Sequence, residues 1–307
     1  MEKPIKILKI ITYIILSIIL IGILVFMYFK IFNIETEEPK QIDKNCNIET
    51  KQYNGRKVFV ITPIGKEKNN QKILYFHGGS YVAQATNQHW EFIERIVSDT
   101  GATVILPDYP LTPKYNYKDV FDMVYPLYNE IIKEVKTNDL IVMGDSAGGG
   151  LALALVEKLS VENIPIPHKT ILISPWLDVR LTNPKIEEVQ KKDKELNKET
   201  LKLAGIAYAG EDGINNYLVN PIDGELSKLK NITIITGTND ILNPDVYILG
   251  ERAKRVNTKI EIKEYQEAGH IWLINKNSSN ELVEAAYSDL VNLLGDRTKI
   301  FHKIVEK

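Results

Sequence analysis

A serine flanked by glycines is the first feature of this sequence that could carry covalent chemistry. Ser146 stands in "GDSAG", residues 144–148, after the apolar run "LIVM" and before the helical pattern "LALALV". A Gly-x-Ser-x-Gly turn between a strand and a helix is typical of a nucleophile elbow, in which a tight turn strains the serine backbone and exposes its hydroxyl. The helix that follows aims free N–H groups at any negative charge formed nearby. The alternative is an ordinary helix start with a serine N-cap.

A serine hydroxyl needs a base, and two later segments offer one with its acidic partner. Asp240 ends "ITIITGTND" and His270 ends "IEIKEYQEAGH", which gives the order Ser, Asp, His along the chain. A histidine takes the serine proton, and a buried carboxylate fixes the imidazole tautomer. Asp245 is a rival acid, although "NPD" at 243–245 favours a helix start. We expect Ser146, Asp240 and His270 to form a catalytic triad.

A histidine and two glycines after an earlier apolar run suggest a site for an oxyanion. His77, Gly78 and Gly79 follow "KILYF". Adjacent glycines let the backbone approach a substrate closely and point N–H groups at it. We expect the N–H groups of Gly78, Gly79 and Ala147 to form an oxyanion hole, and His77 to orient the loop. The alternative is a Gly-Gly turn with an incidental histidine.

These segments belong to a regular alternation of short apolar runs and amphipathic helical patterns. Such alternation predicts a mostly parallel, doubly wound α/β sheet with both faces covered by helices. Ligands bind such sheets beyond the carboxyl ends of the strands, where all the residues named above fall. The predicted strands are 72–76, 102–106, 140–143, 169–173, 232–236 and 260–265.

Two segments depart from the alternation. Residues 51–63, "KQYNGRKVFVITP", carry an Asn54-Gly55 turn between extended residues, which predicts an antiparallel hairpin at one edge of the sheet. Residues 180–230 are longer and more charged, and predict a helical insertion over the sheet. We expect one catalytic domain over residues 51–297, followed by a short tail at 298–307.

Six motifs in order resemble the hormone-sensitive-lipase-like family of α/β-hydrolases over about residues 70–295. "HGGSY" is similar to the family's His-Gly-Gly-Gly-aromatic loop, and "PDYPLTP" to its Asp-Tyr-Arg-Leu-Ala-Pro segment. "GDSAGG" matches the nucleophile box, "SPWLDV" a further signature, and "GTNDIL" and "AGHIW" the acid and base loops.

The resemblance implies an α/β-hydrolase fold and a serine carboxylesterase or lipase. It implies the same triad and oxyanion residues, a small-molecule ester substrate with a short to medium acyl group, and no cofactor or metal. A deacetylase of cell-envelope glycans, or a peptidase, would use the same residues. A non-catalytic binding module on this fold usually lacks a triad member, whereas all three are present here.

Three departures from the family pattern carry expectations of their own. Ser80 replaces the third glycine and changes the loop or adds a hydroxyl near the acyl pocket. Pro110 stands where the family often has arginine, so we expect a structural ion pair to be missing. The segment at 30–50 is short, which indicates a reduced lid. Three aromatic residues either line a pocket for the acyl or alcohol group or belong to the core: Tyr81, Trp176 and Trp272.

The amino-terminal region has a different composition from the rest. Residues 10–29, "IITYIILSIILIGILVFMYF", contain no charge and would span about 30 Å as a helix, the thickness of the hydrocarbon core of a bilayer. No small-x-small cleavage site follows. We expect an uncleaved single-pass membrane anchor behind a short basic tail at 1–9, with the catalytic body outside the cell.

The overall composition excludes or disfavours some classes of function. The 307 residues carry a net charge of −2, which gives no basis for binding nucleic acid. Cys46 is the single cysteine, so no intrachain disulfide forms, and we place it in a connecting segment. No histidine, cysteine and carboxylate cluster has metal-ligand spacing. Nothing in the sequence indicates an oligomeric state.

Overall fold

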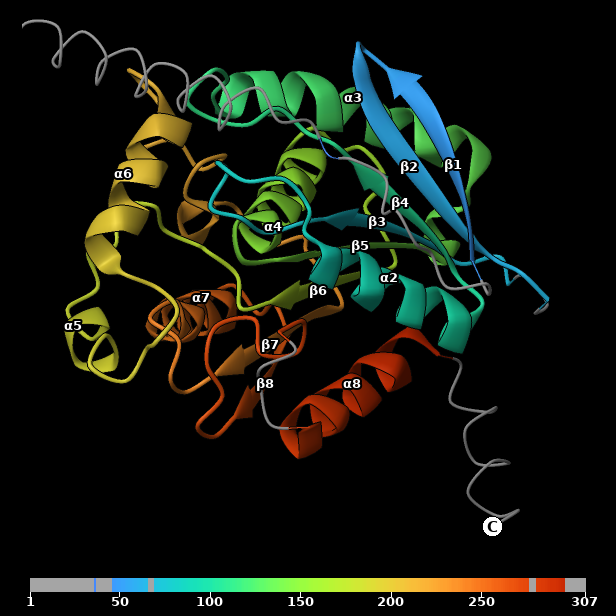
Figure 1. Cartoon of the computed structure of the whole chain (residues 1–307). Helices are drawn as coiled ribbons and strands as arrows, with labels where there is room; N and C mark the ends of the chain where they lie inside the picture. Colours follow the sequence, from blue (N-terminus) through green and yellow to red (C-terminus); the bar gives the residue numbers. More distant parts are fainter. Residues whose placement is uncertain (1–35, 37–45, 66–68, 276–279, 296–307) are drawn as a thin grey trace, which may run out of the picture. The chain divides into compact units, whose positions relative to one another are not determined.

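An eight-stranded sheet forms the centre of the computed structural model, which describes residues 36, 46–65, 69–275 and 280–295 (Figure 1). The strand order is β1-β2-β4-β3-β5-β6-β7-β8, with antiparallel pairing of β1 with β2 and of β2 with β4 and parallel pairing elsewhere. The mostly parallel sheet is therefore confirmed. The strands are β1 (Cys46–Tyr53), β2 (Arg56–Pro63), β3 (Lys72–Phe76), β4 (Thr103–Pro107), β5 (Leu140–Asp145), β6 (Lys169–Ile173), β7 (Ile232–Gly237) and β8 (Ile260–Tyr265).

Alternate residues of the central strands bury their side chains on opposite faces of the sheet. In β3, Leu74 and Phe76 enter one apolar core, whereas Ile73 and Tyr75 enter the other. A strand buried on both faces reads as a continuous apolar run, which is why the sequence shows short apolar blocks here and no polar alternation.

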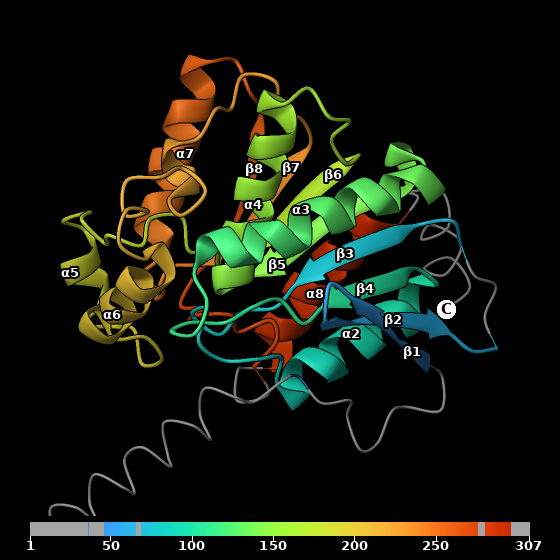
Figure 2. The same cartoon turned by 90° about the horizontal axis from the view of Figure 1, so that it is seen from above.

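Helices cover both faces (Figures 1 and 2). Helices α2 and α8 lie on one face, and α3, α4 and α7 lie on the other. Each follows a strand, as the doubly wound arrangement requires. Their bounds are α2 (Asn87–Thr100), α3 (Tyr117–Glu134), α4 (Ser146–Val161), α7 (Asn243–Arg255) and α8 (Asn280–Leu294), and a 3₁₀ turn, η1 (Thr137–Asp139), precedes β5.

The predicted edge hairpin is present. Asn54 and Gly55 both have positive φ, 48° and 75°, in the two-residue turn between β1 and β2. The expected connecting segment at 30–50 ends earlier than predicted, because β1 begins at Cys46. Cys46 is therefore a buried strand residue, with its sulfur 3.7 Å from the Glu94 carbonyl oxygen.

The segment between β6 and β7 contains short helices. They are α5 (Ile186–Val189), α6 (Lys198–Ala209) and the 3₁₀ turn η2 (Pro221–Asp223). Helices α5 and α6 lie beyond the end of the sheet toward which β3 points (Figure 2). This is also the end at which the predicted site residues leave their strands.

The predicted membrane anchor at 10–29 lies outside the described residues, as do the tails at 1–9 and 298–307. Within the described part of the chain, no helix combines the length and the apolar character needed to cross a bilayer.

Candidate active site

Ser146 occupies a sharp turn between β5 and α4. Its φ is 51°, a left-handed backbone conformation that is rare for a residue with a Cβ. The turn is tight because its glycines touch other backbone: a Cβ on Gly144 would lie 2.3 Å from the Gly148 carbonyl oxygen. A Cβ on Gly148 would lie 2.0 Å from the Phe76 carbonyl oxygen. The strained serine and the crowded glycines are the geometry of a nucleophile elbow.

The structure brings the three predicted triad residues into one hydrogen-bonded chain. His270 Nε2 lies 2.9 Å from Ser146 Oγ, and His270 Nδ1 lies 2.9 Å from Asp240 Oδ2. All three side chains are buried, with Ser146 3% exposed, His270 4% and Asp240 0%. The second Asp240 oxygen accepts the Leu242 N–H at 2.9 Å, which fixes the carboxylate. The hydroxyl, imidazole and carboxylate are placed for proton transfer from serine to histidine.

Carboxylates around His270 favour its charged form. Burial alone would lower the pKa of His270, but Asp240 reverses this effect and raises it above its usual value. Asp193 and Glu195, both from the segment between β6 and β7, act in the same direction on the pKa. Asp193 Oδ2 also accepts the Ile241 N–H at 2.9 Å, which ties that segment to the Asp240 loop. An imidazolium formed during proton transfer is thus stabilised on two sides.

The rival acid, Asp245, lies at the start of α7 and contacts a different partner. Its Oδ1 accepts a hydrogen bond from Asn183 Nδ2 at 2.8 Å. Burial raises the pKa of Asp245 to about 6, whereas Asn183 opposes the shift. Of the two candidate acids, Asp240 is therefore the one that forms a hydrogen bond with His270.

The loop after β3 differs from its prediction at Gly78. The Gly78 N–H donates to Asp145 Oδ1 at 3.0 Å, so it is already used and is not directed at a substrate. No hydrogen bond in the described part of the chain uses the N–H of Gly79, Ser80 or Ala147. The loop nonetheless lies against the serine, because a Cβ on Gly78 would lie 3.0 Å from Ser146 Cβ.

Asp145, the residue before Ser146, organises a buried network that the sequence did not reveal. It accepts hydrogen bonds from Tyr75 Oη at 2.6 Å as well as from Gly78, and its Oδ2 lies 3.2 Å from His89 Nε2. Burial would raise its pKa, but His89 and the hydrogen bonds hold the pKa below its usual value. The Asp145 carboxylate therefore joins the elbow, the loop after β3 and α2.

His89 belongs to the helix start and not to an exposed helical face. Its Nδ1 accepts the Thr86 N–H at 3.0 Å, which completes a capping box at the first turn of α2. The spacing Thr-x-x-His is the one sequence signal for this position, because a capping box places residue N3 beside the N-cap.

His77 orients the loop after β3, as predicted from its position. Its Nδ1 lies 2.7 Å from the Gly78 carbonyl oxygen, and its ring stacks on Tyr109 with centroids 4.5 Å apart. The Tyr109 hydroxyl donates to the His77 carbonyl at 2.6 Å. Burial, followed by the neighbouring His89, lowers the pKa of His77 to about 4, so the ring is neutral near pH 7.

Asp108, two residues before Pro110, forms an ion pair with a residue from another strand. Arg56 of β2 places Nη2 3.0 Å from Asp108 Oδ2, and its Nε donates to the Asp108 carbonyl at 2.8 Å. Thr36 Oγ1 donates to Asp108 Oδ1 at 2.6 Å. Asp108 is therefore paired with a residue distant in the sequence, and the loss of an ion pair at Pro110 itself stays a prediction.

The three aromatic residues considered for the acyl pocket are all buried. Trp272 packs in the core on the α2 and α8 face, with its ring centroid 5.3 Å from that of Tyr265. Tyr81 and Trp176 lie in the opposite core, with centroids 5.8 Å apart. Trp176 is close to the elbow, since its backbone N–H donates to the Ser146 carbonyl at 2.9 Å.

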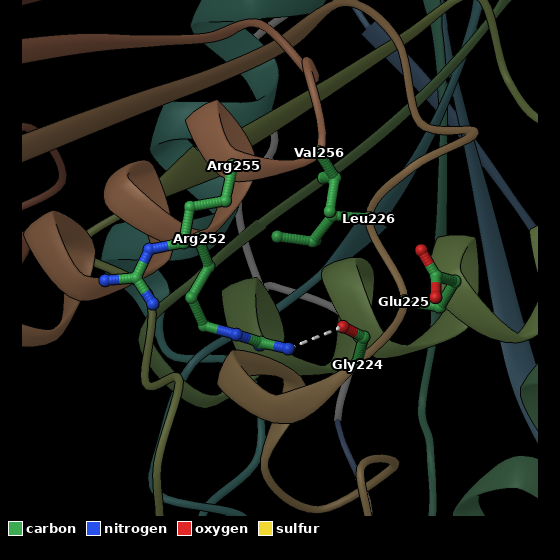
Figure 3. Close-up of a pocket in the computed structure, with 6 residues that line it drawn as sticks. All are labelled: Gly224, Glu225, Leu226, Arg252, Arg255 and Val256. Atoms are coloured by element: carbon green, nitrogen blue, oxygen red, sulfur yellow. Dashed lines mark hydrogen bonds between the residues drawn. The ribbon is translucent and has the colours of Figure 1, made fainter.

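A separate pocket of about 180 Å³ lies near the carboxyl end of α7 (Figure 3). Arg252 reaches across it and donates to the Gly224 carbonyl at 3.1 Å. None of the predicted site residues lines it. The lining residues are Gly224, Glu225, Leu226, Arg252, Arg255 and Val256.

A mostly parallel sheet with a serine elbow after β5, an acid after β7 and a histidine after β8 defines the α/β-hydrolase class. A family model described as the alpha/beta hydrolase fold matches residues 73–274. The chain belongs to this family.

Individual relatives agree on the fold and carry esterase names. An esterase of Acinetobacter venetianus is 33% identical over 198 residues, 64% of this chain and 65% of the relative, so the match spans less than two thirds of that protein. An acetyl-hydrolase of Streptomyces hygroscopicus is 26% identical over 209 residues, 67% of this chain and 69% of the relative. The crystal structure of an esterase from the bacterial hormone-sensitive lipase family superposes with a TM-score of 0.74 at 24% identity, covering 83% of this chain and 87% of that one.

Proposed function

We propose that this protein is a carboxylic-ester hydrolase of the hormone-sensitive-lipase-like type, acting through an acyl-enzyme. The observation that carries the proposal is the chain of two 2.9 Å hydrogen bonds from Asp240 through His270 to Ser146. The serine lies on a strained turn, which is the arrangement of an activated hydroxyl. The esterase names of the relatives support the same activity.

Acylation follows from the positions of the protons. As Ser146 Oγ attacks the ester carbonyl carbon, its proton passes to His270 Nε2, and the carbonyl oxygen becomes an oxyanion. The N–H groups of Gly79 and Ala147 hold the oxyanion, with Ser80 as third donor in place of Gly78, whose N–H is bonded to Asp145. The bond to the alcohol oxygen then breaks, and His270 gives its proton to that oxygen.

Deacylation uses the same groups with water as the nucleophile. His270 Nε2 takes a proton from water, whose oxygen attacks the acyl carbon. The acyl–Oγ bond breaks, the proton returns to Ser146 Oγ, and the carboxylic acid leaves. Asp240 holds Nδ1 protonated and stabilises the imidazolium in both halves of the reaction.

The resemblance and the acetyl-hydrolase relative support a short to medium acyl group. The test is turnover of p-nitrophenyl acetate, butyrate and decanoate by the full-length protein, beside Ser146→Ala and His270→Ala. We expect turnover that favours the shorter esters and falls to background in both variants. A folded protein with no turnover of any ester would overturn the proposal.

We also propose that residues 10–29 anchor the protein in the cell membrane, with the catalytic domain outside the cell. Support comes from the uncharged 20-residue length of that segment and the three lysines before it, Lys3, Lys6 and Lys9. The full-length protein should remain in the membrane pellet after a carbonate wash, and protease added to intact cells should degrade its catalytic domain. Recovery in the carbonate supernatant would refute the anchor.

A further inference from the structure

The loop that carries the proposed oxyanion donors has an unusual backbone. Gly79, Ser80 and Tyr81 have φ values of 116°, 55° and 61°, three successive residues with positive φ. Each non-glycine residue in the left-handed region is strained relative to its preferred conformation. The surrounding structure must therefore hold Ser80 and Tyr81 in place, because nothing in their own chemistry favours this geometry.

Backbone hydrogen bonds fix only the ends of this loop. The N–H groups of Val82 and Ala83 both donate to the Gly79 carbonyl at 2.9 Å. The Thr112 N–H donates to the Tyr81 carbonyl at 2.8 Å. Because the Gly79 carbonyl and the Ser80 N–H belong to one planar peptide, the first two bonds also fix the direction of the Ser80 N–H. The bonds form only while Ser80 and Tyr81 keep their positive φ, and the packing of the Tyr81 side chain must sustain that conformation.

The Tyr81 ring stacks with two other aromatic rings. Tyr208 of α6 stacks on it with centroids 3.5 Å apart and planes inclined by 2°. Trp176 also stacks with Tyr81, with ring centroids 5.8 Å apart and ring planes inclined by 29°. Tyr81 is 1% exposed, and Tyr208 and Trp176 are 0% exposed. Buried aromatic pairs contribute stability beyond the burial of their area, and this contribution offsets backbone strain in the loop.

Close packing of α6 sets the position of Tyr208. A Cβ on Gly205, one turn earlier, would lie 2.7 Å from Val179 Cβ and 3.2 Å from Trp176 Cζ2. Tyr117 of α3 packs edge-on against the other side of Tyr208, with centroids 6.5 Å apart. Tyr208 therefore joins the segment between β6 and β7 to the loop after β3.

We propose that Tyr208 is a positioning residue: its ring holds Tyr81 so that the Gly79 and Ser80 N–H groups face the oxyanion. This inference rests on the proposed function, because it assigns Tyr208 to the same site. It makes the segment between β6 and β7 part of the catalytic apparatus, acting through the loop and not through contact with the substrate.

The ring, and not the hydroxyl, carries this role. The Tyr208 hydroxyl is buried close to the Tyr81 hydroxyl, whose pKa it lowers against the effect of burial, but the two do not reach good hydrogen-bond geometry. Removing it loses only this poorly aligned hydroxyl contact and leaves the stacked rings in place. Tyr208→Phe should therefore behave as the wild type, whereas Tyr208→Ala removes the stacking surface.

The kinetic test compares these two variants with a matched loss of a buried tyrosine elsewhere. Tyr128 of α3 is also 0% exposed, and its hydroxyl donates to the Pro165 carbonyl at 2.8 Å. We expect Tyr208→Ala to lower kcat about 10- to 100-fold with KM within about threefold, because oxyanion contacts form in the transition state. Binding of a trifluoromethyl ketone should weaken in proportion to kcat/KM. Tyr208→Phe should retain kcat, and Tyr128→Ala should lower the Tm but not kcat of the folded protein.

Equal kcat in Tyr208→Ala and wild type would overturn the inference, as would equal loss in Tyr208→Ala and Tyr128→Ala. A crystal structure of Tyr208→Ala separates this failure from failure of the proposed function. If the wild type turns over no ester, the proposed function fails. In that case the crystal structure still tests the inference about the loop. The inference stands if Ser80 and Tyr81 lose their positive φ in Tyr208→Ala, and it fails if they keep it.

Discussion

The guanidinium of Arg56 lies 3.0 Å from the Asp108 carboxylate, and these two residues come from β2 and from the turn after β4. Asp108 is 1% exposed. A buried carboxylate needs a cation or several donors, and here Arg56 and Thr36 supply them. Next to Asp108, Tyr109 stacks on His77, so this ion pair lies beside the loop that follows β3.

Removal of Arg56 should destabilise the protein. We expect Arg56→Met to lower the free energy of unfolding by about 3 kcal/mol, the lower end of the range for breaking a buried pair, because the change removes the guanidinium that lies against the buried Asp108 carboxylate. The measurement is urea unfolding followed by circular dichroism. Lys118→Met is the control, since Lys118 and Asp212 form an exposed pair whose attraction is screened by water. Equal effects of the two changes would refute the role of Arg56.

The two candidate acids can be separated by one substitution each. Asp240→Asn should lower kcat about 10⁴-fold, because the amide no longer fixes the imidazole tautomer. Asp245→Asn should leave kcat within a fewfold of the wild type, because Asp245 bonds to Asn183 and not to His270. Steady-state kinetics with p-nitrophenyl acetate gives both values. A larger loss in Asp245→Asn would reassign the acid.

The dependence of activity on pH should follow the imidazole. His270 accepts a proton only when neutral, and its pKa is raised above 6.5. The kcat/KM should therefore fall as the pH is lowered through a value above 6.5. Asp193→Asn removes one carboxylate that raises this pKa, so the acid limb should move to lower pH. Asp212→Asn, at a distant exposed pair, should leave the profile unchanged. An acid limb that does not move in Asp193→Asn would refute this electrostatic effect.

Two glycines in helices should respond in opposite ways to the same added methyl group. In Gly148→Ala the new Cβ would meet the Phe76 carbonyl oxygen at 2.0 Å, so the elbow must distort. We expect a loss of about 3 kcal/mol or more of stability, together with loss of activity. In Gly250→Ala on α7 the nearest atom is the flexible Ile262 Cδ1 at 3.1 Å. Higher helix propensity should then make this change neutral or stabilising by up to about 1 kcal/mol. Thermal unfolding of both variants checks the contrast.

The sequence was sufficient for the parts of the structure that depend on local pattern. Apolar runs buried on both faces of a sheet have few alternatives, and the runs at 72–76, 169–173 and 260–265 match β3, β6 and β8 residue for residue. The triad side chains follow strand ends of one parallel sheet, so their order along the chain already places them at one edge. The structure brings Ser146, Asp240 and His270 into contact there.

The remaining features depend on contacts between elements distant in the sequence. Whether Gly78 offers its N–H to a ligand is decided by Asp145, 67 residues away. Whether Asp108 has a cation is decided by Arg56 on an edge strand. Tyr208 reaches Tyr81 only because α6 packs closely through Gly205. No periodicity or spacing in the sequence predicts these contacts.

Labelling of the full-length protein with a fluorophosphonate, followed by peptide mass spectrometry, tests the central claim most directly. An activated serine attacks phosphorus and keeps the phosphonyl group, whereas ordinary serines do not react. We predict one modified residue, Ser146, with labelling abolished in Ser146→Ala and strongly slowed in His270→Ala. Absence of the adduct in folded protein, or an adduct on another residue that persists in Ser146→Ala, would contradict the account.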